Sequence, residues 1–457
     1  MLNNGFSRFI LIILGVIFLA LPTFALTNSD FEYSVNDDTK TATITKYLGE
    51  NSVVNIPEEI DGFSVTTIGQ YAFKNNPILT DVKFPGSVTV IEEEAFYECI
   101  KLKNIKFYEN LLRLGKKSFA KCSGLIKVVL PESLMTMDDE VFWRCDNLEE
   151  INIPKNITVL NRGVFYHCLN LKEIILPENL TSIGYGTFSE CNSLIKIDIP
   201  EKVETIGYAA FTNCANLKEV NMHNSVKEIY GFAFGNCKYL EKVSLSNGLT
   251  KIPDNLFVLC ENLVSIVIPE GVTSIEYDAF KYCTNLTSIS LPSTISSIAN
   301  SAFGSCRNLK SVILPSSVTV IGANVFRNNS KELVLQVETN SVAEEYAKKY
   351  NLKYVYTDWT NPEYIKGLVG EDFWAEWDVR QTPAEKPKEQ VNQPPLEKDP
   401  WAEWDARQTP VEKPKEQANQ PSSGEDFWYE WDLWYSSPEE PKEQDNSWWY
   451  EYDAWWE

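Results

Sequence analysis

The chain has 457 residues, with 41 lysines and arginines against 64 aspartates and glutamates, and a formal net charge of −23. This charge argues against nucleic-acid and polybasic lipid-binding proteins, because both classes neutralise phosphates with lysine and arginine. The chain has only two histidines, His167 and His223, which argues against a histidine-built metal site.

Residues 1–25 have the layout of a secretory signal. Arg8 precedes an apolar run from Phe9 to Leu21, and a small-residue exit ends at Ala25. The run is shorter than the roughly 20 residues that span a bilayer. We therefore predict cleavage after Ala25, a secreted or cell-surface location, and no transmembrane anchor in the mature chain. Residues 26–61 follow with strand-like alternation and are predicted to form an N-terminal cap.

Residues 62–333 repeat with a period of 23 residues. Phenylalanine recurs at this spacing from Phe73 to Phe326, and a leucine follows each cysteine after three residues. The cysteines keep the same period: Cys99, Cys122, Cys145, Cys168, Cys191, Cys214, Cys237, Cys260, Cys283 and Cys306.

A unit of 23 residues cannot bury its own apolar face, so consecutive units are predicted to stack into a solenoid with one continuous core. The segment L-x-x-I-x-I reads as a short strand whose aliphatic residues point inward. The returning arm of each unit brings a second isoleucine and the phenylalanine into the core, through a turn and a short helical or irregular piece.

The segment from Ile268 to Leu286 follows the pattern I-P-x-x-V-T-x-I-x-x-x-A-F-x-x-C-x-N-L. This pattern resembles the BspA-like leucine-rich repeats of bacterial and protist surface proteins, and the resemblance covers about residues 50–357. It implies an α/β-type leucine-rich-repeat arc of about twelve units with a parallel sheet on one face. It also implies an adhesin or host-protein binder, and a C-terminal cap at 334–357 made of a helix, read at Ser341–Tyr350, and a strand.

The ten cysteines are predicted to form a buried structural column of reduced thiols. Equivalent positions on successive units lie about 5 Å apart, but their parallel Cβ vectors strain the dihedral angle of a disulfide. Five disulfides, the usual interpretation for an exported chain, remain the alternative. A zinc site is disfavoured because a ladder does not bring four thiolates to one tetrahedral point.

No sequence motif for enzymatic chemistry stands out. The chain lacks H-E-x-x-H, G-x-S-x-G, a complete phosphate loop and an EF-hand loop. We therefore predict that the protein is not an enzyme and uses no cofactor or metal.

The outward residues of the predicted sheet are the candidate binding surface for extracellular or host proteins. Two columns alternate with the inward residues and mix charged, polar and aliphatic side chains. A solvated face without a single ligand is the alternative. The candidate residues are Glu150, Glu173, Lys196, Glu219 and Lys242 in one column, and Asn152, Ile175, Asp198, Asn221 and Ser244 in the other.

Residues 358–457 form a second repeat system. From Trp359 onward the chain has twelve of its thirteen tryptophans and 9 basic against 24 acidic residues. Proline-rich polar spacers predict a largely disordered tail. Repeated W-x-E-W-D segments indicate docking motifs for a tether or second binding module, or clusters that collapse on themselves. If the tail binds cell-envelope glycan or another envelope component, the solenoid becomes a structural spacer. The motif residues are Trp374, Trp377, Asp378, Trp401, Trp404, Asp405, Trp428, Trp431 and Asp432.

Overall fold

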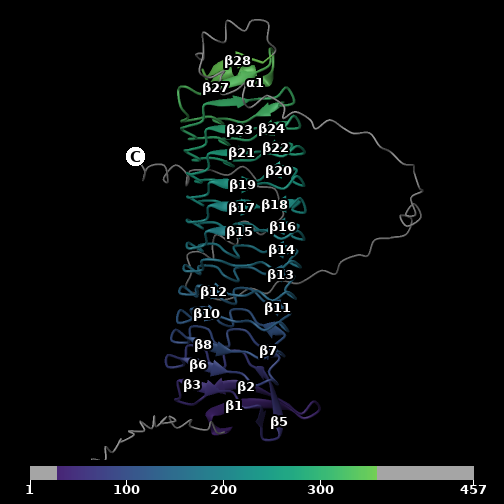
Figure 1. Cartoon of the computed structure of the whole chain (residues 1–457), viewed down its shortest axis with the longest axis vertical. Helices are drawn as coiled ribbons and strands as arrows, with labels where there is room; N and C mark the ends of the chain where they lie inside the picture. Colours follow the sequence, from purple (N-terminus) through teal and green to yellow (C-terminus); the bar gives the residue numbers. More distant parts are fainter. Residues whose placement is uncertain (1–27, 358–457) are drawn as a thin grey trace, which may run out of the picture. The chain divides into compact units, whose positions relative to one another are not determined.

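The computed structural model describes residues 28–357, which form a column of stacked coils (Figure 1). The predicted signal segment and the W-x-E-W-D motifs lie outside the described residues.

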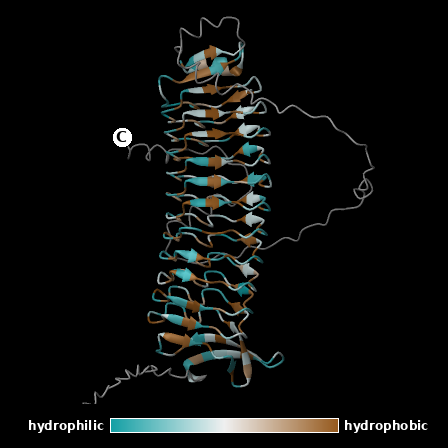
Figure 2. Ribbon diagram, viewed as in Figure 1, coloured by the Kyte–Doolittle hydropathy of each residue, from teal (hydrophilic) through white to brown (hydrophobic). Residues whose placement is uncertain are grey.

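Successive coils contribute short strands to a first ladder of parallel strands, as the L-x-x-I-x-I segments predict, except the coil at 171–177, which forms none. Figure 2 shows hydrophilic and hydrophobic residues alternating within single strands of this ladder. The strands are β3 (Val53–Asn55), β6 (Asp81–Lys83), β8 (Asn104–Lys106), β10 (Lys127–Val128), β12 (Glu150–Ile151), β15 (Lys196–Asp198), β17 (Glu219–Asn221), β19 (Lys242–Ser244), β21 (Ser265–Val267), β23 (Ser288–Ser290), β25 (Ser311–Ile313) and β27 (Val334–Val337).

The returning arm of each coil forms a second ladder, where the sequence predicts only a turn and a short helical or irregular piece. Its strands are mostly two residues long, and each ends in a buried apolar residue of the arm except the last, which ends in the half-buried Ile321. They are β5 (Phe63–Ile68), β7 (Val90–Ile91), β9 (Arg113–Leu114), β11 (Thr136–Met137), β13 (Val159–Leu160), β14 (Ser182–Ile183), β16 (Thr205–Ile206), β18 (Glu228–Ile229), β20 (Lys251–Ile252), β22 (Ser274–Ile275), β24 (Ser297–Ile298) and β26 (Val320–Ile321).

The coils therefore contain almost no helix. In residues 28–357 helical structure is limited to a short 3-10 turn, η1 (Asn28–Asp30), and one α-helix, α1 (Val342–Lys349). A turn follows each second-ladder strand and closes the coil. It contains two residues in left-handed backbone conformation: the second residue before the repeat phenylalanine and the second residue after it. In the coil around Phe211 these residues are Ala209 (φ 54°) and Asn213 (φ 60°). Most of these positions are not glycine, so the turns carry backbone strain that packing must offset.

The core is built from stacked columns of identical side chains. The phenylalanine rings from Phe73 to Phe326 stack face to face, with neighbouring centroids 4.7 to 5.9 Å apart. The ten cysteines are free and buried beside them. Each thiol donates a hydrogen bond to the carbonyl oxygen of the phenylalanine in the preceding coil, as Cys214 Sγ does to Phe188 O at 3.1 Å. The thiol column thus links successive turns as well as filling space.

The two ends of the column are covered differently. At the N-terminal end, β1 (Phe31–Asn36) and β2 (Thr41–Tyr47) pair antiparallel, β2 pairs with β5, and β4 (Glu59–Ile60) folds back on β5. At the C-terminal end, α1 begins after the N-cap residue Ser341, and β28 (Lys353–Tyr356) pairs with β27. Tyr47 and Tyr346 place their rings against the first and last phenylalanines of the stack.

Candidate ligand-binding face

The outward side chains of the first ladder form a face with two columns. The start column contains the first residue of each strand. The end column contains the residue two positions later, which for β10 and β12 lies just after the strand, and the residue between the two columns points into the core. The ladder register brings column members side by side: Glu219 lies between Lys196 and Lys242, and Asn221 lies between Asp198 and Ser244. The predicted column members on β15, β17 and β19 are therefore adjacent in space.

The predicted site residues differ in how accessible they are. Glu150, Lys196, Asp198, Lys242 and Ser244 are exposed. Glu219 and Asn221 are half-buried, because the Asn221 amide nitrogen donates to Glu219 Oε1 and to Asp198 Oδ1, both at 3.0 Å.

Glu173 and Ile175 are exposed but lie outside any strand. The segment 171–177 forms no ladder bridge to the coils on either side, so the sheet is interrupted between β12 and β15. Ile175 is 87% exposed, the most of any large hydrophobic residue in 28–357. The period in the sequence predicts a strand here, which the structure does not form.

Asn152 has a structural role in addition to its exposed position. Its side-chain oxygen accepts from the backbone N–H of Leu130 at 2.8 Å, and its side-chain nitrogen donates to the Leu130 carbonyl at 2.9 Å. The amide thus takes the place of a strand partner where β10 has ended. The two bonds hold the Asn152 amide against the backbone and leave one N–H and one oxygen lone pair for a ligand.

The charges in the middle of the face neutralise one another. Lys127 forms an ion pair with Glu150, and its hydrogen bond lowers the pKa of that carboxyl group. Lys196 pairs with Asp198 at 3.1 Å; the Asn221 hydrogen bond and then Lys196 lower the pKa of Asp198. Both carboxylates are therefore ionised near neutral pH and already have partners within the chain.

Exposed aliphatic side chains lie in the columns or next to them in sequence. Ile126 and Ile195, each directly after the inward leucine of its coil, are 55% and 49% exposed, and Val129 and Val267 in the end column are 63% and 70% exposed. Such a face can bury apolar area against a protein without leaving an unpaired charge in the interface, because the charged side chains in the middle of the face already have partners.

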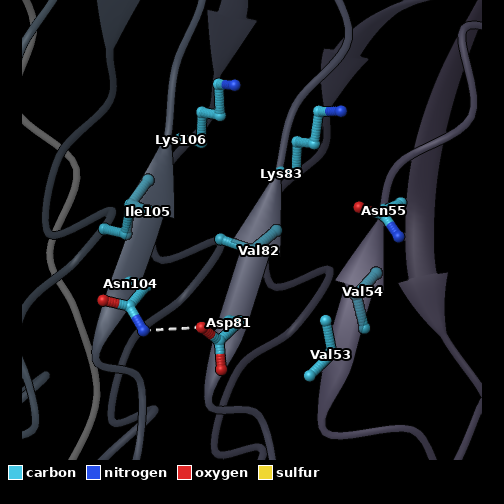
Figure 3. Close-up of a pocket in the computed structure, with 9 residues that line it drawn as sticks. All are labelled: Val53, Val54, Asn55, Asp81, Val82, Lys83, Asn104, Ile105 and Lys106. Carbon is cyan, nitrogen blue, oxygen red and sulfur yellow. Dashed lines mark hydrogen bonds between the residues drawn. The ribbon is translucent and has the colours of Figure 1, made fainter. Parts of the chain in front are cut away.

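A shallow pocket at the N-terminal end of the face was not among the sequence predictions. Three strands line it, β3, β6 and β8, whose middle residues are Val54, Val82 and Ile105 (Figure 3). The rims are Val53, Asp81 and Asn104 from the start column and Asn55, Lys83 and Lys106 from the end column. The I-P and F-P pairs that end the first two strands, Ile56-Pro57 and Phe84-Pro85, were the signal that could have extended both columns back to this end.

The described residues contain no group of three or more metal-ligating side chains. His167 contacts Asp146 and Glu190, and His223 lies 3.8 Å from Glu201. Burial raises the pKa of every cysteine, to about 12 for Cys99 and Cys306 at the ends of the column. The thiols therefore stay protonated and are poor nucleophiles. Among residues 28–357, no helix has the length and apolar character to cross a membrane.

Comparison with known proteins identifies the repeat. The family described as "BspA type Leucine rich repeat region" matches residues 52–172, 158–286 and 250–363. The chain is similar to a leucine-rich repeat protein from Bacteroides ovatus, with 25% identity and a TM-score of 0.52 over 73% of this chain and 99% of that one. It is also similar to a leucine-rich cell surface protein from Faecalibacterium prausnitzii, with 29% identity and a TM-score of 0.40 over 65% and 94%. A pneumococcal vaccine antigen, PcpA, has 17% identity and a TM-score of 0.42 over 72% and 97%. No curated protein matches significantly.

Proposed function

We propose that this chain, which belongs to the BspA-type leucine-rich-repeat family, is an exported adhesin-like protein that recognises protein ligands on the first-ladder face. The family consists of cell-surface proteins. One relative in structure is described as a cell surface protein and another as a vaccine antigen. The same relationships support a binding role without enzymatic activity.

The observation that carries this proposal is the exposed aliphatic set on the face. A solvent-facing isoleucine such as Ile175, 87% exposed, gains nothing for folding from its outward position. Covering such a side chain in an interface contributes about 1.5 to 3 kcal/mol. The ion-paired neighbours give a polar surround of the kind found at the rims of protein interfaces.

The test is capture of extracellular-matrix proteins by the chain from residue 26 onward. Ile175→Ser with Ile195→Ser should weaken capture at least tenfold, because two apolar contacts are lost. The matched control is Val159→Ser with Val320→Ser, which changes exposed aliphatics of the second ladder, 41% and 58% exposed. Equal capture by both pairs and the parent protein would remove the face as the binding surface.

The tail supplies the competing function. If the face variants bind normally while Trp374→Ala, Trp401→Ala and Trp428→Ala together abolish retention on envelope material, the tail recognises the ligand and the solenoid serves as a spacer. The two results separate the proposals because the substitutions lie in different segments.

A further inference from the structure

The N-terminal pocket differs from the rest of the first-ladder face in having two lysines side by side. Lys83 and Lys106 are ladder partners on its end-column rim, and both are exposed. Within residues 28–357 neither lysine has a carboxylate at ion-pair distance; Lys106 lies over the ring of Tyr108, with Nζ 5.4 Å from the centroid. Farther along the face, Lys127, Lys172 and Lys196 pair with acidic side chains. Lys242 is unpaired within the same residues, but it has Glu219 as a ladder partner instead of a second lysine.

The acidic residue of the pocket does not neutralise these lysines. Asp81 lies on the opposite rim, where its Oδ1 accepts a hydrogen bond from Asn104 Nδ2 at 2.6 Å. Figure 3 shows this pair at one end of the close-up and the lysine side chains at the other. In the ladder register Lys83 lies beside Asn55 rather than an acidic residue. The pocket therefore presents two adjacent positive charges on a chain whose net charge is −23.

We propose that this pocket binds an acidic segment of a partner protein, with a carboxylate at Lys83 and Lys106 and an adjoining apolar or aromatic side chain against Val53. This inference rests on the proposed function and names the partner chemistry at one end of the same face. Charge complementarity supports it, because two neighbouring ammonium groups match one or two carboxylates. Val53 is 55% exposed on the opposite rim and supplies an apolar contact.

The extent of the positive row favours a peptide over a sulfated polysaccharide. The end column continues from Lys106 with Val129, Asn152 and Ile175, so the positive row ends after two coils. A polyanionic chain gains affinity from many successive cations, whereas a single acidic side chain needs only a short site. The exposed Val53 on the opposite rim gives a protein segment an apolar contact that a polysulfated sugar would not use.

The experiment titrates the full chain with fluorescent nonapeptides that have one tryptophan beside two glutamates. Lys83→Gln with Lys106→Gln should weaken binding about tenfold, because two exposed ion pairs are lost. Lys83→Arg with Lys106→Arg should restore it. Lys251→Gln, an exposed lysine of β20 on the second ladder, should have no effect. Binding should also weaken between 50 and 300 mM salt.

If the parent chain binds the peptide, three outcomes overturn the inference. One is unchanged peptide affinity in the double glutamine variant, and another is equal binding of a peptide whose glutamates are replaced by glutamine. The third is heparin that displaces the peptide and binds more tightly through the same lysines, which would make the site a polysulfate site. If the peptide fails to bind while matrix-protein capture remains sensitive to Ile175→Ser, the inference fails and the proposed function stands. Capture insensitive to every substitution on the face contradicts both.

Discussion

Replacing one cysteine in the middle of the column tests why the thiols recur. Cys214 is fully buried, and its Sγ donates to the Phe188 carbonyl at 3.1 Å. The same carbonyl also accepts from the backbone N–H of Cys191 at 3.1 Å. Cys214→Ala therefore removes one of two hydrogen bonds to Phe188 O and leaves the carbonyl with a partner.

The magnitude follows from these contacts. Loss of a hydrogen bond whose acceptor keeps another donor costs about 1 kcal/mol, at the low end of the range for buried groups. Removing the sulfur from a fully buried position costs about 1 kcal/mol more, comparable to one buried methylene. We expect the free energy of unfolding to fall by about 2 kcal/mol.

Urea unfolding followed by circular dichroism, with reductant present, measures this change. The control is Ser293→Ala, an exposed residue for which a change within about 0.5 kcal/mol is expected. A loss below about 0.5 kcal/mol for Cys214→Ala would refute the reasoning, since the thiol would then contribute neither packing nor a hydrogen bond. The slope of the transition must remain unchanged for the comparison to hold.

Three further predictions concern the turns, the C-terminal cap and the thiols. Ala209→Gly should raise stability by about 1 kcal/mol in thermal melts. The strain of alanine in a left-handed conformation is larger than the extra entropy that glycine loses on folding. Gly186→Ala should lower stability by a similar amount through backbone strain alone, since the added Cβ meets nothing closer than 3.9 Å. Lys348 and Tyr356 lower the pKa of Glu344 from 4.5 to about 2. The ionised carboxylate stabilises the fold fully above pH 4.5, and this stabilisation is lost as the pH falls toward 2. Between pH 6 and pH 3 the free energy of unfolding should therefore fall more in the parent protein than in the Glu344→Gln variant. Equal falls in urea titrations would contradict this. A thiol reagent at pH 8 should label no cysteine in the folded chain and about ten after unfolding without reductant, whereas near-zero labelling would indicate disulfides.

The first-ladder face shows where sequence reasoning succeeds. Because side chains alternate along a strand and units stack in register, the 23-residue period alone places Lys196, Glu219 and Lys242 in one row. The same period predicts a solenoid, its inward aliphatics and its phenylalanine column. A repeated short-range pattern is sufficient for these features because every coil meets the same neighbours.

The features that sequence reasoning missed depend on contacts between particular coils. The second ladder is accompanied by left-handed turns in every coil. Residue preference predicts these turns only in part, because Asn213 and Asn236 favour the conformation whereas Phe232 and Leu259 do not. The interruption at Ile175 and the capture of the Leu130 backbone by Asn152 are deviations that a consensus unit hides.

By itself, then, the sequence determined the repeat, its fold family and which residues face outward, because these depend on periodicity. Only the tertiary structure decided which outward residues already have partners. Lys127 and Lys83 both lie outward on their strands, yet the first is paired with Glu150 of the next coil and the second has no carboxylate at ion-pair distance among residues 28–357. The difference arises because a side chain's availability to a ligand is set by its neighbours across coils, which lie 23 residues or more away along the chain.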